Sequence, residues 1–112
     1  MTTLHTIRED GDSVVILDQT RLPLHVEFVT LRSLDAAAHA IRVMQVRGAP
    51  LIGVTAAYGV ALALRQGVPL DTALAVLGDT RPTAVNLRWA LDRVRAKVIA
   101  LPPGERADAA WL

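Results

Sequence analysis

The chain has 112 residues, enough for one domain with a real core, and 52% of them are hydrophobic while 21% are charged. This high hydrophobic content, together with 12 basic and 11 acidic residues that nearly cancel, excludes a disordered chain. The small net charge argues against a nucleic-acid binder that works by bulk positive charge. Because cysteine is absent, this segment can build no disulfide framework, thiolate nucleophile or zinc ribbon.

No metal site and no membrane segment are expected. The three histidines, His5, His25 and His39, share no ligand-like spacing. The longest apolar run, residues 49–64, is shorter than the roughly 20 residues that a membrane span needs. The amino-terminal residues lack an apolar signal core. We therefore expect a cytoplasmic protein that binds neither membranes nor nucleic acid.

The first part of the chain has a β pattern. Thr3 to Arg8 is compatible with a strand, residues 9–12 (Glu-Asp-Gly-Asp) are a turn signal, and residues 13–18 form an apolar strand. After Pro23, polar and apolar residues alternate from Leu24 to Leu31. A small antiparallel meander is the simplest arrangement of these segments.

From Ser33 the apolar period becomes helical, with Ser33 as the expected N-cap and Gly48 as the end of the first helix. Pro50 is well placed as the first residue of the next helix. Residues 51–64 are apolar around the whole circumference, which predicts a fully buried central helix. The apolar stripe predicted for the first helix is Leu34, Ala37, Ala38, Ile41 and Met44.

Three further helices are predicted: one over residues 68–77, an amphipathic one after Thr83 that Pro102 ends, and one from about Glu105. The predicted fold class is α+β. A small antiparallel meander in residues 1–32 precedes a helical bundle in residues 33–112, together forming a single domain.

The first candidate site is Arg47-Gly48-Ala49-Pro50, which enters the central helix. The first amides of a helix have no internal partner, and the helix dipole there favours an anion. Gly48 permits close approach of a ligand, and Arg47 adds a planar fork of donors suited to phosphate. A loop in which Gly48 caps the preceding helix and Arg47 is solvated is the simpler explanation of these residues alone.

The second candidate site is the segment from Thr80 to Leu87. Arg81 precedes a helix start, and Thr80 or Thr83 can cap that helix. Two such starts, each preceded by an arginine, can converge on one anion, although capping and a surface arginine explain the segment too. Asn86 is either a satisfied buried amide or a ligand contact.

A third polar cluster lies in residues 16–23, at the end of a predicted strand. A structural turn capped by Asp18 explains it more simply than a binding site does.

Three motifs occur in order: Ile16-Leu-Asp-Gln-Thr-Arg-Leu-Pro23, then Val46-Arg-Gly-Ala-Pro50 running into Ile52-Gly-Val-Thr-Ala-Ala-Tyr-Gly59, then Arg81-Pro-Thr-Ala-Val-Asn-Leu87. In this combination the chain resembles the methylthioribose-1-phosphate isomerases. These enzymes are related to the regulatory subunits of initiation factor 2B and to ribose-1,5-bisphosphate isomerases. The resemblance favours the ligand-binding interpretation of both helix starts.

The resemblance implies a homodimeric, cofactor-free enzyme of methionine salvage that converts 5-methylthioribose 1-phosphate to 5-methylthioribulose 1-phosphate. It implies that Arg47, Gly48, Ala49 and Arg81 contact this sugar phosphate, with Asn86 as a further contact. The family's catalytic cysteine and aspartate lie in a Rossmann-like C-terminal domain. This segment would therefore be the N-terminal domain, holding no catalytic residue and inactive alone.

Three alternatives remain open at this stage. The same fold can isomerise ribose 1,5-bisphosphate, or it can be a non-catalytic regulatory module like the initiation-factor subunits. The short chain can also be a bare interaction domain whose exposed apolar faces need a partner.

Overall fold

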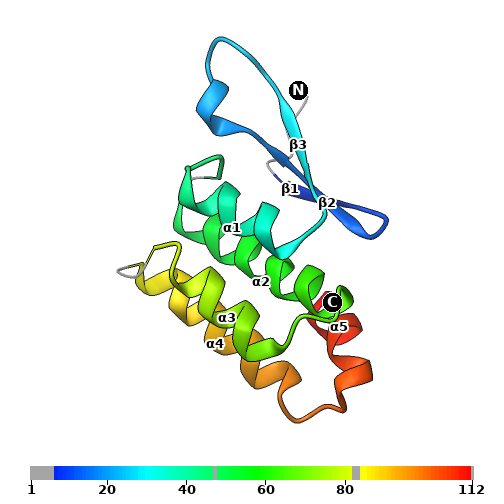
Figure 1. Ribbon diagram of the computed structural model, residues 1–112. Helices are drawn as coiled ribbons and strands as arrows, with labels where there is room; N and C mark the ends of the chain where they lie inside the picture. Colours follow the sequence, from blue (N-terminus) through cyan, green and yellow to red (C-terminus); the bar gives the residue numbers. More distant parts are fainter. Residues whose placement is uncertain (1–6, 47, 82–83, 112) are drawn as a thin grey trace.

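The computed structural model describes residues 7–46, 48–81 and 84–111, and in it a small antiparallel sheet is followed by helices. The predicted α+β class, with a meander before a helical bundle, is confirmed. Figure 1 shows the sheet lying above α1 and the helical layer below it. The elements are β1 (Ile7–Asp10), β2 (Ser13–Leu17), the 3-10 turn η1 (Gln19–Arg21), β3 (Phe28–Leu31), α1 (Leu34–Arg42), α2 (Ala49–Arg65), α3 (Leu70–Gly78), α4 (Val85–Val98) and α5 (Pro103–Trp111).

The sheet has the strand order β1-β2-β3, and both pairings are antiparallel. Gly11 makes the turn between β1 and β2 with a φ of 61°, which glycine adopts without strain. The third strand is shorter than predicted, because only Phe28–Leu31 pairs with β2. Val14 and Leu31 pair in the sheet and belong to the same buried cluster as Ile41 of α1, so the two layers share one core.

Helix α1 begins as predicted, with the Ser33 hydroxyl accepting a hydrogen bond of 3.1 Å from the Ala36 amide. Its predicted end at Gly48 is wrong, because the helix stops at Arg42. Met44 takes a φ of 65°, and the amides of Met44 and Gln45 return to the carbonyls of Ile41 and Ala40. This is the left-handed Schellman ending that glycine usually makes. Met44 consequently lies outside the apolar stripe of α1.

Replacing Ser33 by alanine is expected to lower the free energy of unfolding by about 1 kcal/mol, because the Ala36 amide loses its acceptor. Ser33→Asp keeps a capping oxygen and should stay within about 0.5 kcal/mol of the unmodified chain. Urea unfolding followed by circular dichroism measures both values. Equal loss in the two variants would contradict a capping role.

Helix α2 is central, since α1, α3, α4 and α5 all pack against it. Small residues allow this: an ideal Cβ on Gly59 would lie only 3.0 Å from the Cβ of Ala37 in α1. The prediction that this helix is fully buried is wrong, however. Val54 is 44% exposed, next to the exposed Trp89 of α4, so one face is uncovered. Among the described helices, none is both long enough and apolar enough to cross a membrane.

Candidate functional site

The amino-terminal ends of α2 and α4 lie side by side at one end of the helical layer. Figure 1 shows the two helices running in the same direction. An ideal Cβ on Gly53, one turn into α2, would lie 3.2 Å from the Cβ of Ala90 and 3.9 Å from the carbonyl oxygen of Asn86 in the first turn of α4. The absence of a side chain at Gly53 therefore lets the two helix starts approach closely, and both direct their unpaired amides to the same end.

At the start of α2, Gly48 is the N-cap, with a φ of 90° that favours glycine. Gly48 has no side chain to cap the helix, and Pro50 in the first turn has no amide hydrogen. The first helical hydrogen bond runs from the Ile52 amide to the Gly48 carbonyl oxygen at 3.0 Å. An ideal Cβ at Gly48 would touch nothing within 4 Å, so the space beside this helix start is open to a ligand.

The N-cap residue of α4 is Ala84, whose side chain cannot cap the helix. Thr80 was one of two candidates for that cap, but its hydroxyl donates to the Leu77 carbonyl at 2.6 Å and closes α3 instead. The other candidate, Thr83, lies outside the described residues. Because Ala84 offers no capping oxygen, the first amides of α4 can donate hydrogen bonds to an external anion.

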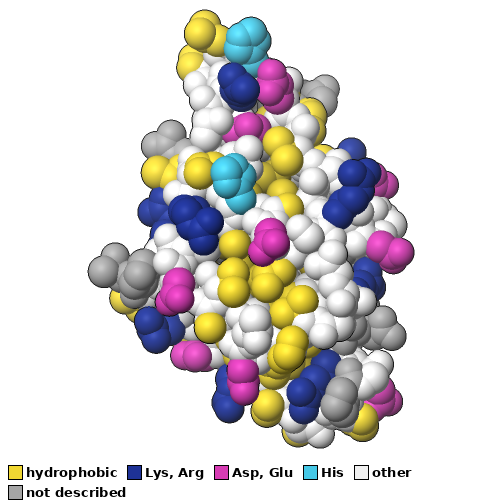
Figure 2. Space-filling view, viewed as in Figure 1, with side chains coloured by type: hydrophobic (Ala, Val, Ile, Leu, Met, Phe, Trp, Pro, Cys, Tyr) yellow, Lys and Arg dark blue, Asp and Glu magenta, His cyan; other side chains and the backbone are white. Residues whose placement is uncertain are grey.

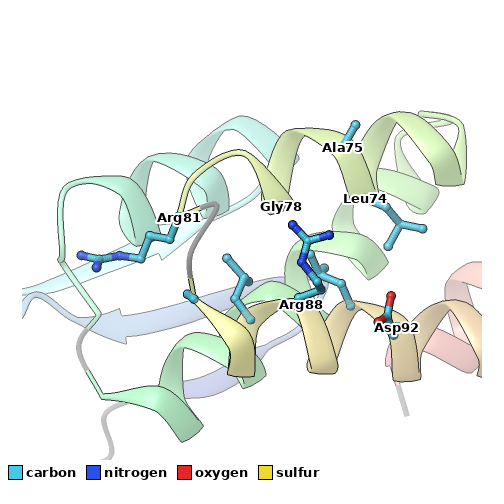
Figure 3. Close-up of a pocket in the computed structure, with 9 residues that line it drawn as sticks. Leu74, Ala75, Gly78, Arg81, Arg88 and Asp92 are labelled. Carbon is cyan, nitrogen blue, oxygen red and sulfur yellow. The ribbon is translucent and has the colours of Figure 1, made fainter.

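Arg81 reaches from the α3–α4 connection to the end of α1. Its Nε donates to the carbonyl oxygen of Ile41 at 3.3 Å, and Figure 3 shows its side chain pointing away from Arg88. Ile41 lies in the last turn of α1, where the helix dipole attracts a cation. The guanidinium is thus held beside the place where the chain leaves α1 towards Gly48.

Arg47, the other predicted phosphate ligand, lies outside the described residues, so its convergence with Arg81 stays a prediction. Ala49 is the first residue of α2. Asn86 is exposed, which contradicts the alternative of a buried amide, and it lines an open groove of about 570 Å³ together with Pro50. Whether Asn86 contacts a ligand also stays a prediction.

A smaller cavity of about 230 Å³ lies between α3 and α4, lined by Leu74, Gly78, Arg88 and Asp92 among others. Arg81 also lines this cavity, and Figure 3 shows its side chain pointing away from Arg88 and Asp92. Ligand pockets usually have volumes of about 300–1,000 Å³, so this one is small for a sugar phosphate. We therefore place the candidate site at the helix ends.

Among the residues that the structure describes, no three histidine, aspartate or glutamate side chains gather as metal ligands. Figure 2 shows basic and acidic side chains interspersed over the face in view. This face therefore has no broad positive surface that would attract an anion, and such an attraction would come from particular groups at the helix ends.

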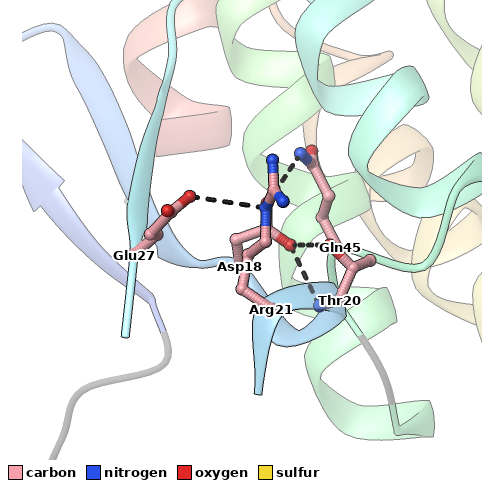
Figure 4. A network of polar contacts seen from close by, with 5 residues as sticks. All are labelled: Asp18, Thr20, Arg21, Glu27 and Gln45. Atoms are coloured by element: carbon pink, nitrogen blue, oxygen red, sulfur yellow. Dashed lines mark hydrogen bonds and ion pairs between the residues drawn. The ribbon is translucent and has the colours of Figure 1, made fainter. Parts of the chain in front are cut away.

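Asp18 forms a polar network that sequence reasoning identified only in part (Figure 4). Its Oδ1 accepts hydrogen bonds from the Thr20 amide at 3.0 Å and the Thr20 hydroxyl at 2.6 Å, which confirms the predicted capped turn. Its Oδ2 accepts a bond of 3.2 Å from Nε2 of Gln45, 27 positions later in the chain. Nothing in the local pattern indicated Gln45, because a contact over that separation depends on the fold.

Asp18 is 5% exposed. Burial raises the pKa of Asp18, but hydrogen bonds from Thr20 and Gln45 and the charge of Arg21 outweigh this effect and hold the pKa below its usual value. The carboxylate is therefore ionised at neutral pH, and both of its oxygens act as acceptors.

Solved structures define the class of this fold. The 5-methylthioribose 1-phosphate isomerase from Pyrococcus horikoshii matches with a TM-score of 0.82 and 32% identity, over 95% of this chain and 34% of that chain. The translation initiation factor eIF-2B subunit delta from A. fulgidus matches with a TM-score of 0.87 and 34% identity, over 97% of this chain and 35% of that one. The chain thus has a fold shared by a sugar-phosphate isomerase and an initiation-factor subunit.

Curated relatives narrow the class. A methylthioribose-1-phosphate isomerase from Methylorubrum populi is 57% identical over 104 residues, covering 90% of this chain and 28% of the relative. Another from Brucella anthropi is 54% identical over 112 residues, covering 96% of this chain and 31% of the relative. No family model matches the chain. The resemblance to the methylthioribose-1-phosphate isomerases is confirmed, and the chain spans about 30% of the length of these relatives.

Proposed function

We propose that this chain is the N-terminal, substrate-binding domain of a methylthioribose-1-phosphate isomerase. The enzyme would convert 5-methylthioribose 1-phosphate to 5-methylthioribulose 1-phosphate in methionine salvage, as a cytoplasmic homodimer without a cofactor. The identity of 54–57% to relatives of that name supports this proposal. The structural observation that carries it is the adjacency of two helix starts whose N-cap residues, Gly48 and Ala84, supply no side-chain cap, with Arg81 held at the same end of the bundle.

The phosphate would bind at these helix starts. The amides of Gly48 and Ala49 would donate to its oxygens, and Arg47 and Arg81 would supply charge-assisted hydrogen bonds. Asn86, at the edge of the adjoining groove, would be available for a further polar contact with the sugar. An anion gains from such a site because helix dipoles and guanidinium groups all favour negative charge there.

The reacting groups would come from elsewhere in the enzyme. The sequence contains no cysteine, so the cysteine and aspartate implied by the resemblance would belong to a Rossmann-like C-terminal domain. The meander in residues 1–32 and the helical part in residues 33–112 would then form a single domain, which covers one side of the substrate. This chain alone would be inactive.

A substrate panel on the complete enzyme tests the proposal. Turnover is expected with 5-methylthioribose 1-phosphate, and none with the 112-residue chain alone. Faster turnover of ribose 1,5-bisphosphate would favour the related isomerase. The likeness to an eIF-2B delta subunit supports a second candidate, a non-catalytic regulatory module. Absence of turnover with either sugar phosphate, together with partner-dependent assembly, would favour that module.

A further inference from the structure

The turn η1 is tied to the connection between α1 and α2 by two hydrogen bonds that meet at one residue. The side chain of Gln45 donates to Asp18 at 3.2 Å, and the carbonyl oxygen of Gln45 accepts a bond of 2.9 Å from the Gln19 amide. Gln45 is therefore held by its main chain and by its side chain, and Figure 4 shows the side-chain bond to Asp18. The backbone amide of Gln45 donates to the Ala40 carbonyl oxygen at 2.9 Å, and this bond connects the turn to the end of α1.

This anchored residue stands three positions before Gly48, the N-cap of α2. The chain has just left α1 through Met44, whose φ of 65° reverses the direction of the backbone. The adjoining Val46 is fully buried. The bonds to η1 therefore hold the chain at Gln45, shortly before the start of α2.

Asp18 can hold the side chain of Gln45 firmly because its carboxylate is ionised and buried. Its Oδ1 accepts two hydrogen bonds from Thr20, and its Oδ2 is free to accept the bond from the side-chain amide of Gln45. On the solvent side, Arg21 forms an ion pair of 3.5 Å with Glu27. A hydrogen bond to a charged, buried acceptor is stronger than one between neutral groups.

We propose that Asp18 is a positioning residue for the phosphate site, acting through Gln45 on the start of α2 at Gly48. The inference rests on the proposed function, since it concerns the site that would hold the sugar phosphate. In this role Asp18 would not contact the substrate itself. Its effect is on the affinity for the phosphate group, through the placement of the first amides of the helix.

Two variants of the complete enzyme test this role. Gln45→Met removes the side-chain bond and keeps the Thr20 cap, while Asp18→Ala removes both. Each should raise KM for 5-methylthioribose 1-phosphate and the inhibition constant of inorganic phosphate about fivefold, as expected for one lost hydrogen bond. The value of kcat should change less than about twofold, because uniform binding is lost.

Two further variants separate positioning from stability. Asp18→Asn can keep a bond to Gln45 after the Gln45 amide rotates, so it should restore most of the phosphate affinity. Ser33→Ala destabilises α1 at its opposite end and should leave KM within about twofold of wild type. Gln45→Met with unchanged KM and phosphate affinity would overturn the inference. A complete protein that turns over no 5-methylthioribose 1-phosphate would instead overturn the proposed function.

Discussion

Replacing Arg81 by alanine in the complete enzyme is expected to lower kcat/KM by at least about tenfold, and Arg47→Ala should have an effect of similar size. A hydrogen bond from a charged donor contributes about 1.5–3 kcal/mol, and about 1.4 kcal/mol corresponds to a factor of ten. The phosphate would lose such a donor in each variant. Steady-state kinetics with 5-methylthioribose 1-phosphate and inhibition by inorganic phosphate measure the change.

Arg88→Ala is the matched control for this prediction. Arg88 lies in the first turn of α4 and lines the small cavity between α3 and α4, as Arg81 does, but Arg81 points away from it and reaches the end of α1. For Arg88→Ala, kcat/KM should therefore change less than about twofold. Arg81→Lys keeps the charge but loses the planar fork and should give an intermediate loss. Because Arg81→Ala also removes the bond to Ile41, melting temperatures must accompany the kinetics. Wild-type kinetics in both arginine-to-alanine variants would contradict the assignment.

The regular elements could be predicted because their signals are local. The serine at position 33 capped α1 as expected, and the change from alternating to helical periodicity marked the boundary between sheet and helices. The end of α1 could not be predicted in the same way. Gly48 was the expected terminator, yet Met44 adopts the left-handed conformation, and Gly48 uses its positive φ at the start of the next helix.

The exposed face of α2 is a second feature that could not be predicted from the sequence. A segment that is apolar on every side predicts contacts on every side. Within the described residues, helices cover most of α2 but leave Val54 exposed. Sequence composition records how much of a helix is apolar, and it does not state which element covers each face.

The candidate site was predicted as two separate helix starts, and their adjacency required the structure. The approach of α4 to Gly53 depends on packing between residues more than 30 positions apart in the sequence. The bond from Arg81 to Ile41 spans 40 positions, and the bond from Gln45 to Asp18 spans 27. Local periodicity carries no information about such partners, although the motifs that contain Arg81 and Asp18 were both recognised.

Gly59→Ala should destabilise the chain although alanine favours helix by about 1 kcal/mol over glycine. The added Cβ would lie 3.0 Å from the Cβ of Ala37 and 3.2 Å from both terminal methyl groups of Leu77. Overpacking of this kind costs about 1–3 kcal/mol. Leu77→Ala should lower the free energy of unfolding by about 2–5 kcal/mol, because Leu77 is fully buried and its removal leaves a cavity.

The double variant tests whether these two side chains compete for the same space. Leu77→Ala removes both methyl groups that the Cβ at position 59 would meet, and that Cβ then occupies part of the cavity. The combined loss should therefore fall short of the sum of the single losses by about 1 kcal/mol or more. Gly104→Ala is the control, since its Cβ would meet nothing within 4 Å and it should couple to Leu77→Ala by less than about 0.5 kcal/mol. Losses at 59 and 77 that add within that margin in urea unfolding would show that α1, through Ala37, is what excludes a side chain at Gly59.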